Sequence, residues 1–206
     1  MDFSKIRREI CEISTLIYKR GLISGGDGNV SVRVSGTDRI LVTPKGVHKG
    51  MLRPDELSLV ALDGGHVSGP LPSSELVLHL EVYKKREDIN AIIHAHPPWT
   101  TALYVAGKAV DRPFILSEAE MVLGRVGVVP YLPPGSTALA THTSNTLEEV
   151  KVCVLLNHGA ISCGKDLMEA FMLMESLENC AKITVFTHLL GGPQGMESQP
   201  DSPSSS

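Results

Sequence analysis

Two histidines lie two residues apart at the end of an apolar run, in the segment Ile92-Ile93-His94-Ala95-His96-Pro97. The β-branched residues before them favour a strand, and a strand directs alternate side chains to the same face. His94 and His96 would then lie side by side, as half of the ligand set of a transition-metal site, with zinc the first candidate. Two unrelated histidines at a strand end would give the same pattern, so other residues must complete the site.

A third histidine, His158, repeats this arrangement. It follows the apolar run 152–156 and precedes Gly159, which leaves room for a close approach to the backbone. Three histidines with one open position are typical of a catalytic zinc site rather than a structural one. The sequence therefore predicts that His158 joins the first pair.

Glu75 is the acid/base candidate, because it lies at the start of an expected helix behind Ser73 and Ser74. The alternative is a glutamate that merely suits the helix dipole. The remaining histidines have no convergent partners in the sequence and are expected to be ordinary surface or core residues. These are the histidines at positions 48, 66, 79, 142 and 188.

Three loops carry groups that bind anions: Gly28-Asn29, Lys45-Gly46 and Ser73-Ser74. They offer backbone N–H groups, short hydroxyl or amide donors and one cation, and the last loop precedes a helix N-terminus. Such groups can hold a phosphate without a large basic surface, although each pair is also a common turn sequence. Neither a G-x-G-x-x-G after a strand nor a Walker A lysine pattern occurs, so nucleotide binding has little support.

The elements that must position these residues follow from periodicity and turn signals. Apolar residues recur at helical spacing from residue 3 to residue 17, and Gly21 follows, which predicts an amphipathic first helix. Alternation predicts paired strands at 30–34 and 40–43. The remaining pattern predicts helices at about 73–86, 99–105, 118–123, 138–150 and 166–190, a helical turn at 54–57, and strands at 57–62, 90–96, 126–131 and 152–156.

The composition, with 42% hydrophobic and 20% charged residues among 206, is that of an ordinary globular protein. We expect one domain over 1–192 and a disordered Ser/Pro/Gln-rich tail over 193–206. The net charge of -4 gives no basic signature for nucleic acid, and no apolar run approaches the roughly 20 residues that span a membrane. Without a C-x-x-C or a secretory segment, four cysteines are expected to be reduced core thiols of a cytoplasmic protein: Cys11, Cys153, Cys163 and Cys180.

Five short motifs occur in order along the chain, and together they are specific although each alone is weak. They are Gly28-Asn29-Val30-Ser31, Thr43-Pro44-Lys45-Gly46, Ser73-Ser74-Glu75, His94-Ala95-His96-Pro97 and Asn157-His158-Gly159. In this order and spacing the sequence resembles the class II aldolase/adducin family, and most closely its L-fuculose-1-phosphate aldolase branch. The resemblance covers about residues 5–190.

The resemblance implies an α/β fold with three layers, α/β/α, and a central, mostly antiparallel sheet. It also implies a homotetramer with active sites at subunit interfaces. One Zn2+ per subunit would be held by His94, His96 and His158, and Glu75 would be the catalytic carboxylate that also ligates zinc when substrate is absent. The phosphate-binding positions of the family fall on Gly28, Asn29, Lys45, Gly46, Ser73 and Ser74.

The resemblance also implies a reaction. Zinc acts as a Lewis acid toward dihydroxyacetone phosphate, and Glu75 shuttles the proton on the carbon next to the carbonyl. The aldolase has a tyrosine where this chain reads Phe114 to Glu120, and another near its C-terminus, where this tail has none. Lys45 stands where the aldolase has a threonine, and a cation there suits phosphate. The aldehyde is therefore left unassigned.

Three functions remain, in this order. The first is a zinc-dependent aldolase, a carbon–carbon lyase of carbohydrate metabolism acting on an L-fuculose 1-phosphate-like ketose 1-phosphate. The second is a related sugar-phosphate dehydratase (methylthioribulose-1-phosphate type), epimerase or decarboxylase. The third is a non-catalytic structural protein like the adducin head, which has no need of three histidines and a base together. The choice depends on the site and not on the fold.

Overall fold

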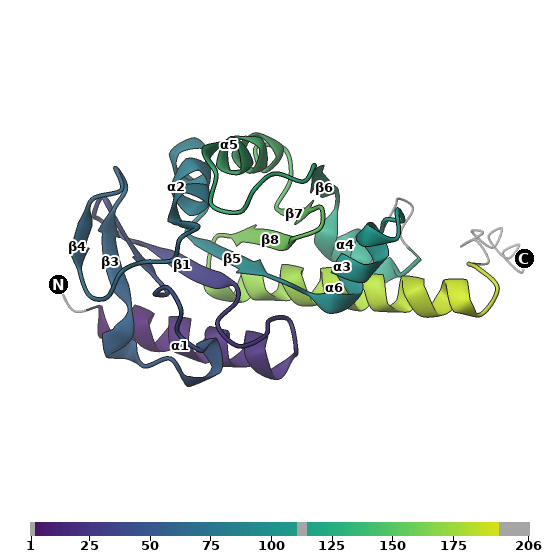
Figure 1. Ribbon diagram of the computed structural model, residues 1–206, viewed down its shortest axis with the longest axis horizontal. Helices are drawn as coiled ribbons and strands as arrows, with labels where there is room; N and C mark the ends of the chain where they lie inside the picture. The colour runs from purple at the N-terminus through teal and green to yellow at the C-terminus, as the bar shows by residue number, and fades with distance from the viewer. Residues whose placement is uncertain (1–2, 111–114, 194–206) are drawn as a thin grey trace, which may run out of the picture.

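The computed structural model describes residues 3–110 and 115–193. Helices cover both faces of one eight-stranded sheet, which gives three layers (Figure 1). The strands lie in the order β4-β3-β2-β1-β5-β8-β7-β6, and only β6 and β7 pair in parallel. The expected α/β/α fold with a mostly antiparallel sheet is therefore confirmed.

The central strand of interest is β5, which carries His94 and lies between β1 and β8. Asn29 of β1 pairs with His94, and Ala95 pairs with Ala160 of β8. The end of β5 is therefore flanked by the first residues of two neighbouring strands. The strands are β1 (Asn29–Val34), β2 (Arg39–Val42), β3 (Ser58–Ala61), β4 (His66–Ser68), β5 (Ala91–Ala95), β6 (Val126–Val129), β7 (Val152–Leu155) and β8 (Gly159–Gly164).

The helices divide between the two faces of the sheet. Figure 1 shows α2 and α5 together on one face and α1 and α6 on the other, with α3 and α4 packed against α6. They are α1 (Ser4–Lys19), α2 (Leu76–Lys85), α3 (Pro98–Val105), α4 (Ser117–Leu123), α5 (Thr137–Thr146) and α6 (Leu167–Leu189), with short 3-10 turns η1 (Lys49–Met51) and η2 (Pro54–Glu56).

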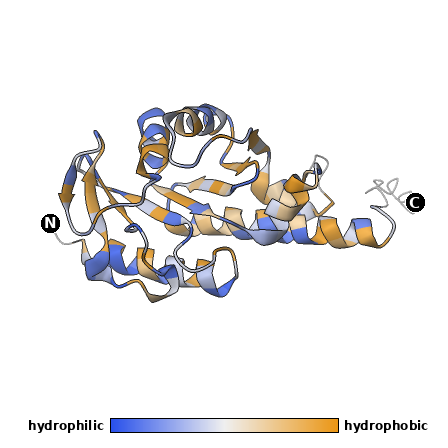
Figure 2. Ribbon diagram, in the orientation of Figure 1, coloured by the Kyte–Doolittle hydropathy of each residue, from blue (hydrophilic) through white to orange (hydrophobic). Residues whose placement is uncertain are grey.

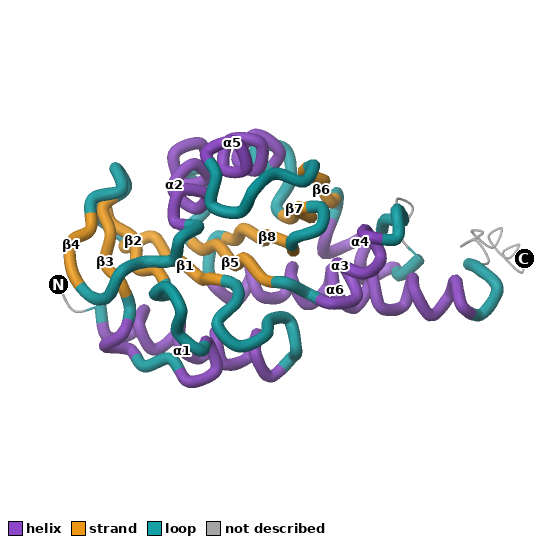
Figure 3. The backbone as a smooth tube through the Cα atoms, in the orientation of Figure 1, coloured by secondary structure: helices purple, strands orange, loops and turns teal. Residues whose placement is uncertain are grey.

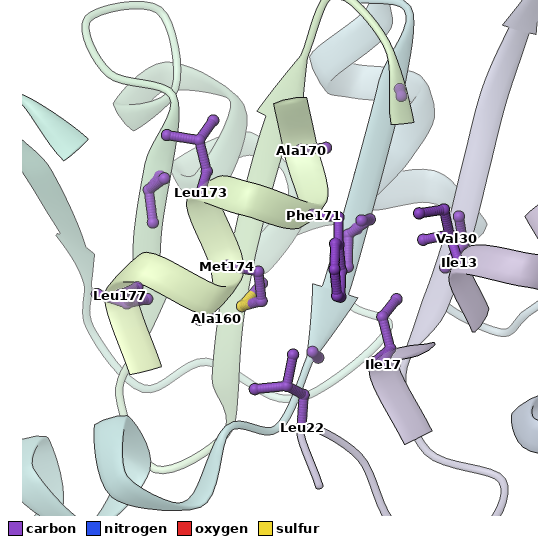
Figure 4. Close-up of a cluster of buried hydrophobic side chains, with 14 of the residues drawn as sticks. Ile13, Ile17, Leu22, Val30, Ala160, Ala170, Phe171, Leu173, Met174 and Leu177 are labelled. Atoms are coloured by element: carbon purple, nitrogen blue, oxygen red, sulfur yellow. The ribbon is translucent and has the colours of Figure 1, made fainter. Parts of the chain in front are cut away.

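A hydrophobic core fills each side of the sheet, and Figure 2 colours the strands and much of α6 as hydrophobic. On the α6 side, Phe171 and Met174 lie against the sheet near Ala160, beside Ile17 of α1 (Figure 4). The small Ala160 lets the helix approach the strands closely. Burying each large apolar side chain stabilises the fold by about 1.5–3 kcal/mol, which fixes the strands that carry the histidines.

Most expected elements are present, with ends that differ by a few residues. The helix expected over 138–150 ends at Thr146, because Ser, Asn and Thr near that end are weak helix formers. The strand expected over 126–131 ends at Val129, because Pro130 cannot donate to the ladder. The helix expected from residue 73 begins at Leu76, so that Glu75 is its N-cap residue.

One strand, β8, does not follow from the sequence pattern. His158 therefore lies in the tight turn between β7 and β8, not at a strand end that leads into a loop. Asn157 takes the left-handed conformation, with φ of 58°, and the N–H of His158 donates to the carbonyl of Leu155. The turn fixes the backbone of His158, while Nδ1 of its ring has no hydrogen-bond partner among the described residues.

The four cysteines are buried free thiols, as expected. Among residues 3–110 and 115–193, no helix combines the length and the apolar character that crossing a membrane requires. Phe114, which opens the segment where the family has a tyrosine, lies outside the described residues. So does the tail expected over 193–206, apart from Pro193.

Candidate active site

Three imidazoles converge where β5 ends beside the turn between β7 and β8. Nε2 of His94 lies 3.2 Å from Nε2 of His96. One ligand atom from each of His94, His96 and His158 lies within 4.8 Å of the other two. The strand's period of two places His94 and His96 together, and the β7–β8 turn brings in the third ring.

The hydrogen on His94 can be assigned from its partner. Nδ1 of His94 lies 2.9 Å from the carbonyl oxygen of Ala160, which only accepts, so Nδ1 carries the hydrogen. In the neutral ring, Nε2 then bears a lone pair that faces Nε2 of His96 and, at 3.1 Å, Oε2 of Glu75. Electron-rich atoms that face one another require positive charge among them, as protons or as a metal ion. Three imidazoles and a carboxylate are a donor set that fits Zn2+.

The other two rings are neutral at neutral pH. Burial, together with the proximity of the His94 ring, lowers the pKa of His96 to about 3 and that of His158 to about 4. Metal ligation requires the neutral form of histidine, because the coordinating nitrogen must offer its lone pair. These rings need not lose a proton at pH 7 before they bind a metal.

Glu75 points into this cluster rather than onto its own helix. It is the N-cap residue of α2, yet its side chain makes no capping bond. Oε2 accepts a hydrogen bond from Nδ2 of Asn29 at 3.1 Å, and Oε1 lies 3.5 Å from Nε2 of His158. Among the described residues, Oε1 has no hydrogen-bond partner. Interaction with the helix dipole alone does not account for this orientation.

The carboxyl group of Glu75 is ionised at neutral pH. Burial by itself raises its pKa, but the adjacent imidazoles of His94 and His158 and the hydrogen bond from Asn29 outweigh burial and hold the pKa well below its ordinary value. An ionised carboxylate with one free oxygen is a potential general base.

The three loops predicted to bind an anion meet at a cavity of about 360 Å³ beside the imidazoles. This volume is sufficient for a small phosphorylated sugar. His94, buried beneath the cavity, is the one predicted site residue that does not line it. The nine that do are Gly28, Asn29, Lys45, Gly46, Ser73, Ser74, Glu75, His96 and His158.

Backbone hydrogen bonds fix two of these loops to each other. The N–H of Lys45 donates to the carbonyl of Leu71 at 3.1 Å, and the N–H of Ser73 donates to the carbonyl of Thr43 at 3.2 Å. In the view of Figure 3, the loop from β4 to α2 runs across the front of the sheet toward the start of α2. The pairing places Lys45, which is exposed, beside the serine pair.

Lys49 is a cavity residue for which the sequence gives no signal. Its side chain is buried, and Nζ donates to the carbonyl of Gly26 at 3.0 Å and to that of Val47 at 2.8 Å. Burial lowers its pKa, and nearby Asp27 acts in the opposite direction. Lysine in a polar loop is usually exposed, so only the folded chain reveals a buried cation that joins two loops.

Other neighbours refine the predicted roles. Both ends of the Asn29 side-chain amide are engaged, by Glu75 and by His79, so only its backbone remains for an anion. Oδ2 of Asp27 lies 3.8 Å from Nδ1 of His96. Among the described residues, no other histidine joins the cluster.

The fold and the site together define an α/β/α protein with a cluster of three histidines that could hold a metal ion, beside a polar cavity. Residues 8–185 match the family described as Class II Aldolase and Adducin N-terminal domain, so the chain belongs to this family.

Similar proteins carry two different activity names. An L-fuculose phosphate aldolase of Methanocaldococcus jannaschii is 38% identical over 184 residues, which are 89% of this chain and 98% of that protein. A 3-oxo-tetronate 4-phosphate decarboxylase of Escherichia coli is 36% identical and covers 88% of this chain and 89% of its own. Because these two relatives are almost equally identical to the chain, the percentages do not select one activity.

Solved structures that are similar to the chain also carry different activity names. A structure titled L-fuculose 1-phosphate aldolase superposes with a TM-score of 0.87 at 29% identity, covering 96% of this chain and 93% of its own. YgbL of Escherichia coli, titled a putative aldolase/epimerase/decarboxylase, gives a TM-score of 0.84 at 34% identity, covering 89% and 90%.

Proposed function

We propose that this chain is a zinc-dependent lyase that reversibly cleaves a ketose 1-phosphate, of the L-fuculose 1-phosphate kind, to dihydroxyacetone phosphate and an aldehyde. The observation that carries the proposal is the position of Glu75. Asn29 holds Oε2, which lies 3.1 Å from Nε2 of His94, and Oε1 lies 3.5 Å from Nε2 of His158 with no hydrogen-bond partner among the described residues. A base placed beside a metal-binding cluster suits removal of a proton next to a carbonyl.

The phosphate of the substrate would lie in the cavity formed by the three loops. Backbone N–H groups at Gly28 and Gly46 and the hydroxyls of Ser73 and Ser74 suit phosphate oxygens, and the exposed Lys45 adds a positive charge. Binding the phosphate away from the reacting carbon holds that carbon in place.

His94, His96 and His158 would hold the Zn2+, with Glu75 as an additional ligand when substrate is absent. When bound, the ion supplies Lewis acidity that stabilises negative charge on the substrate oxygens. Glu75 takes the proton from the carbon next to the carbonyl, and the electron pair of that C–H bond forms the enediolate. The enediolate carbon then bonds to the aldehyde carbon, and the aldehyde oxygen receives the carbonyl π pair and takes a proton from water. In the cleavage direction that hydroxyl gives its proton to water, the carbon–carbon bond breaks as the aldehyde carbonyl forms, and Glu75 returns the proton to the enediolate carbon.

Decarboxylation is the second candidate, favoured by the relatives named 3-oxo-tetronate 4-phosphate decarboxylase, of which that of Haemophilus influenzae is 37% identical. A 3-oxo acid loses its carboxylate as CO2 and leaves the electron pair in an enolate of the ketone. For a tetronate phosphate this enolate is the enediolate of dihydroxyacetone phosphate. The enediolate carbon then takes up a proton to give dihydroxyacetone phosphate, and the protonated form of Glu75 would deliver it. The same cavity and the same carboxyl group would therefore serve both reactions.

Dehydratase and epimerase activities use related enolate chemistry but have no specific support in this chain. A non-catalytic, adducin-like role is disfavoured, because a structural head has no need of a base aimed at three imidazoles.

Product analysis separates the two leading activities. The zinc-loaded protein is incubated with L-fuculose 1-phosphate or with 3-oxo-tetronate 4-phosphate, and dihydroxyacetone phosphate and CO2 are measured. Dihydroxyacetone phosphate without CO2 from the first substrate supports the aldolase. Turnover of the second substrate alone, with CO2, assigns the decarboxylase. No turnover of either compound would contradict the proposal.

We also propose a homotetramer with active sites at its interfaces, located in the cytoplasm. In Figure 1 the C-terminal end of α6 projects beyond the sheet, and Figure 2 colours much of it as hydrophobic. Phe186, Leu189 and Leu190 there are 43%, 75% and 88% exposed, and Met121 of α4 is 85% exposed. Neighbouring subunits would cover such a surface. Light scattering of the purified protein tests the tetramer, and a monomer would contradict it.

A further inference from the structure

A row of four buried polar side chains lies behind Glu75, between β1 and α2. Asn29 and Ser31 are 3% and 0% exposed, and His79 and Tyr83 are 0% and 1% exposed. Two periodicities produce the row. Alternate residues of β1 face α2, and positions 75, 79 and 83 follow one another at four-residue intervals along one side of the helix.

One arrangement of hydrogens satisfies the whole row. Glu75 Oε2 can only accept, so the nitrogen of the Asn29 amide faces it, at 3.1 Å, and the amide oxygen faces Nε2 of His79. That oxygen also only accepts, so Nε2 of His79 carries the hydrogen. Nδ1 then accepts from the Ser31 hydroxyl at 2.6 Å. The Tyr83 hydroxyl donates to Ser31 at 2.9 Å, which is closer than its other acceptor, the carbonyl of Asn90 at 3.5 Å.

Burial keeps these groups in the required protonation states. It lowers the pKa of His79 to about 3, so the ring is neutral and retains one donor and one acceptor. Burial also raises the pKa of Tyr83, so its hydroxyl keeps its hydrogen. At the far end Arg33 donates to the carbonyl of Tyr83 at 2.8 Å and lies over its ring at 4.8 Å from the centroid.

We propose that His79 is a positioning residue for the base, an inference that rests on the function proposed for Glu75. By donating to the Asn29 oxygen, His79 fixes the orientation of that amide, and the amide nitrogen in turn holds Oε2 of Glu75. Oε1 is thereby left free and directed at the imidazoles. Without His79 the amide can rotate, which would bring its oxygen against the carboxylate.

A purely structural role makes a different prediction. If the row only stabilises packing of α2 on β1, replacing any of its members lowers stability and leaves the orientation of Glu75 unchanged. If His79 positions the base, a variant that retains a donor toward Asn29 should behave like the wild type, and a variant of similar size without the donor should not. His79→Gln and His79→Phe are these two variants.

The first experiment uses NMR of the metal-free protein and does not depend on activity. We expect the His79 ring to be a single neutral tautomer with hydrogen on Nε2, and the Asn29 side-chain amide hydrogens to exchange slowly with water. In His79→Phe their exchange should accelerate at least tenfold, while His79→Gln should stay near the wild type. Ser31→Ala should perturb the tautomer, whereas Ser14→Ala, which removes an equally buried hydroxyl from α1, should not.

The second experiment measures deuterium exchange into dihydroxyacetone phosphate by the zinc-loaded protein. We expect His79→Phe to lower kcat by about 10–100-fold with KM and zinc content unchanged, because the phosphate loops and the imidazoles are untouched. His79→Gln should recover most of the rate, and Ser14→Ala should retain it.

Several results would overturn the inference. They are a mixed or Nδ1–H tautomer in the wild type, unchanged Asn29 exchange in His79→Phe, or a loss of rate that His79→Gln and Ser14→Ala share. If the wild type exchanges no deuterium at all, the proposed function fails, and the amide-exchange result still decides whether His79 holds Asn29.

Discussion

Gly159 tests the packing that brings the three imidazoles together. It begins β8 directly after His158, and a Cβ added there would lie 2.3 Å from the carbonyl oxygen of Ala95 and 2.8 Å from Cδ2 of His96. Ordinary contacts begin at 3.4 Å. The Ala95 carbonyl belongs to the buried central strand and cannot rotate away, so the two strands must separate by about 1 Å, given the dense packing of protein interiors.

We therefore expect Gly159→Ala to lower the free energy of unfolding by about 1–3 kcal/mol, the usual range for overpacking. For a chain of this size the melting temperature should fall by roughly 3–10 °C. Because the displaced atoms belong to His96 and its strand, zinc affinity should also fall, by about 10–100-fold, as when the support of a metal ligand is lost.

Thermal unfolding of the metal-free protein measures the first effect, and competition with a chromophoric zinc chelator measures the second. Gly26→Ala is the matched control, because Gly26 borders the same cavity and its added Cβ would meet nothing closer than 3.8 Å. If Gly159→Ala kept the stability and the zinc affinity of Gly26→Ala, the close approach of Gly159 to His96 would be refuted.

Three further predictions concern the ligands, the buried lysine and pH. His94→Ala should reduce zinc from about one ion per chain to a trace by elemental analysis, and a folded variant that keeps its zinc would remove His94 from the ligand set. Lys49→Met should destabilise the protein by about 1.5–3 kcal/mol and weaken binding of inorganic phosphate in calorimetry, whereas unchanged phosphate binding would place Lys49 outside the anion site. Burial lowers the pKa of His79 to about 3, whereas the pKa in the unfolded chain is roughly 6.5. Below about pH 6.5 the unfolded state therefore binds a proton that the folded state does not. The free energy of unfolding consequently falls as the pH drops toward 3. At pH 5 the neutral, buried His79 lowers the free energy of unfolding by about 2 kcal/mol. The difference in that free energy between wild type and His79→Gln should therefore shrink by this amount between pH 7.5 and 5. A difference independent of pH would show that His79 is not buried and neutral.

The sequence predicts the parts of the site that depend on local order. A strand's period of two suffices to place His94 beside His96, and the loop composition suffices to suggest an anion site. The hairpin of β7 and β8 is harder to foresee, because β8 consists mostly of small residues and its partner is fixed by tertiary pairing. The turn signal Asn157-His158-Gly159 could have revealed it.

The polar row behind Glu75 is invisible in the strand pattern alone. Ser31 alternates with valines, a pattern that predicts an exposed face, but α2 covers Ser31 and buries it completely, while Arg33 on the same face is half-buried. The burial of Lys49 likewise depends on its contact with the loop at Gly26, which lies 23 residues earlier in the sequence. Such features are set by how elements pack and not by local propensity.

The central claim is that Glu75 and a metal held by the three histidines activate the carbon next to a carbonyl. Deuterium exchange into dihydroxyacetone phosphate tests it most directly, because the exchange needs neither the aldehyde nor a carboxylate substrate. The zinc-loaded wild type should incorporate one deuterium, and the metal-free protein and Glu75→Gln should be slower by at least 100-fold. Exchange that persists at the wild-type rate in Glu75→Gln, or no exchange by the zinc-loaded wild type, would contradict the claim.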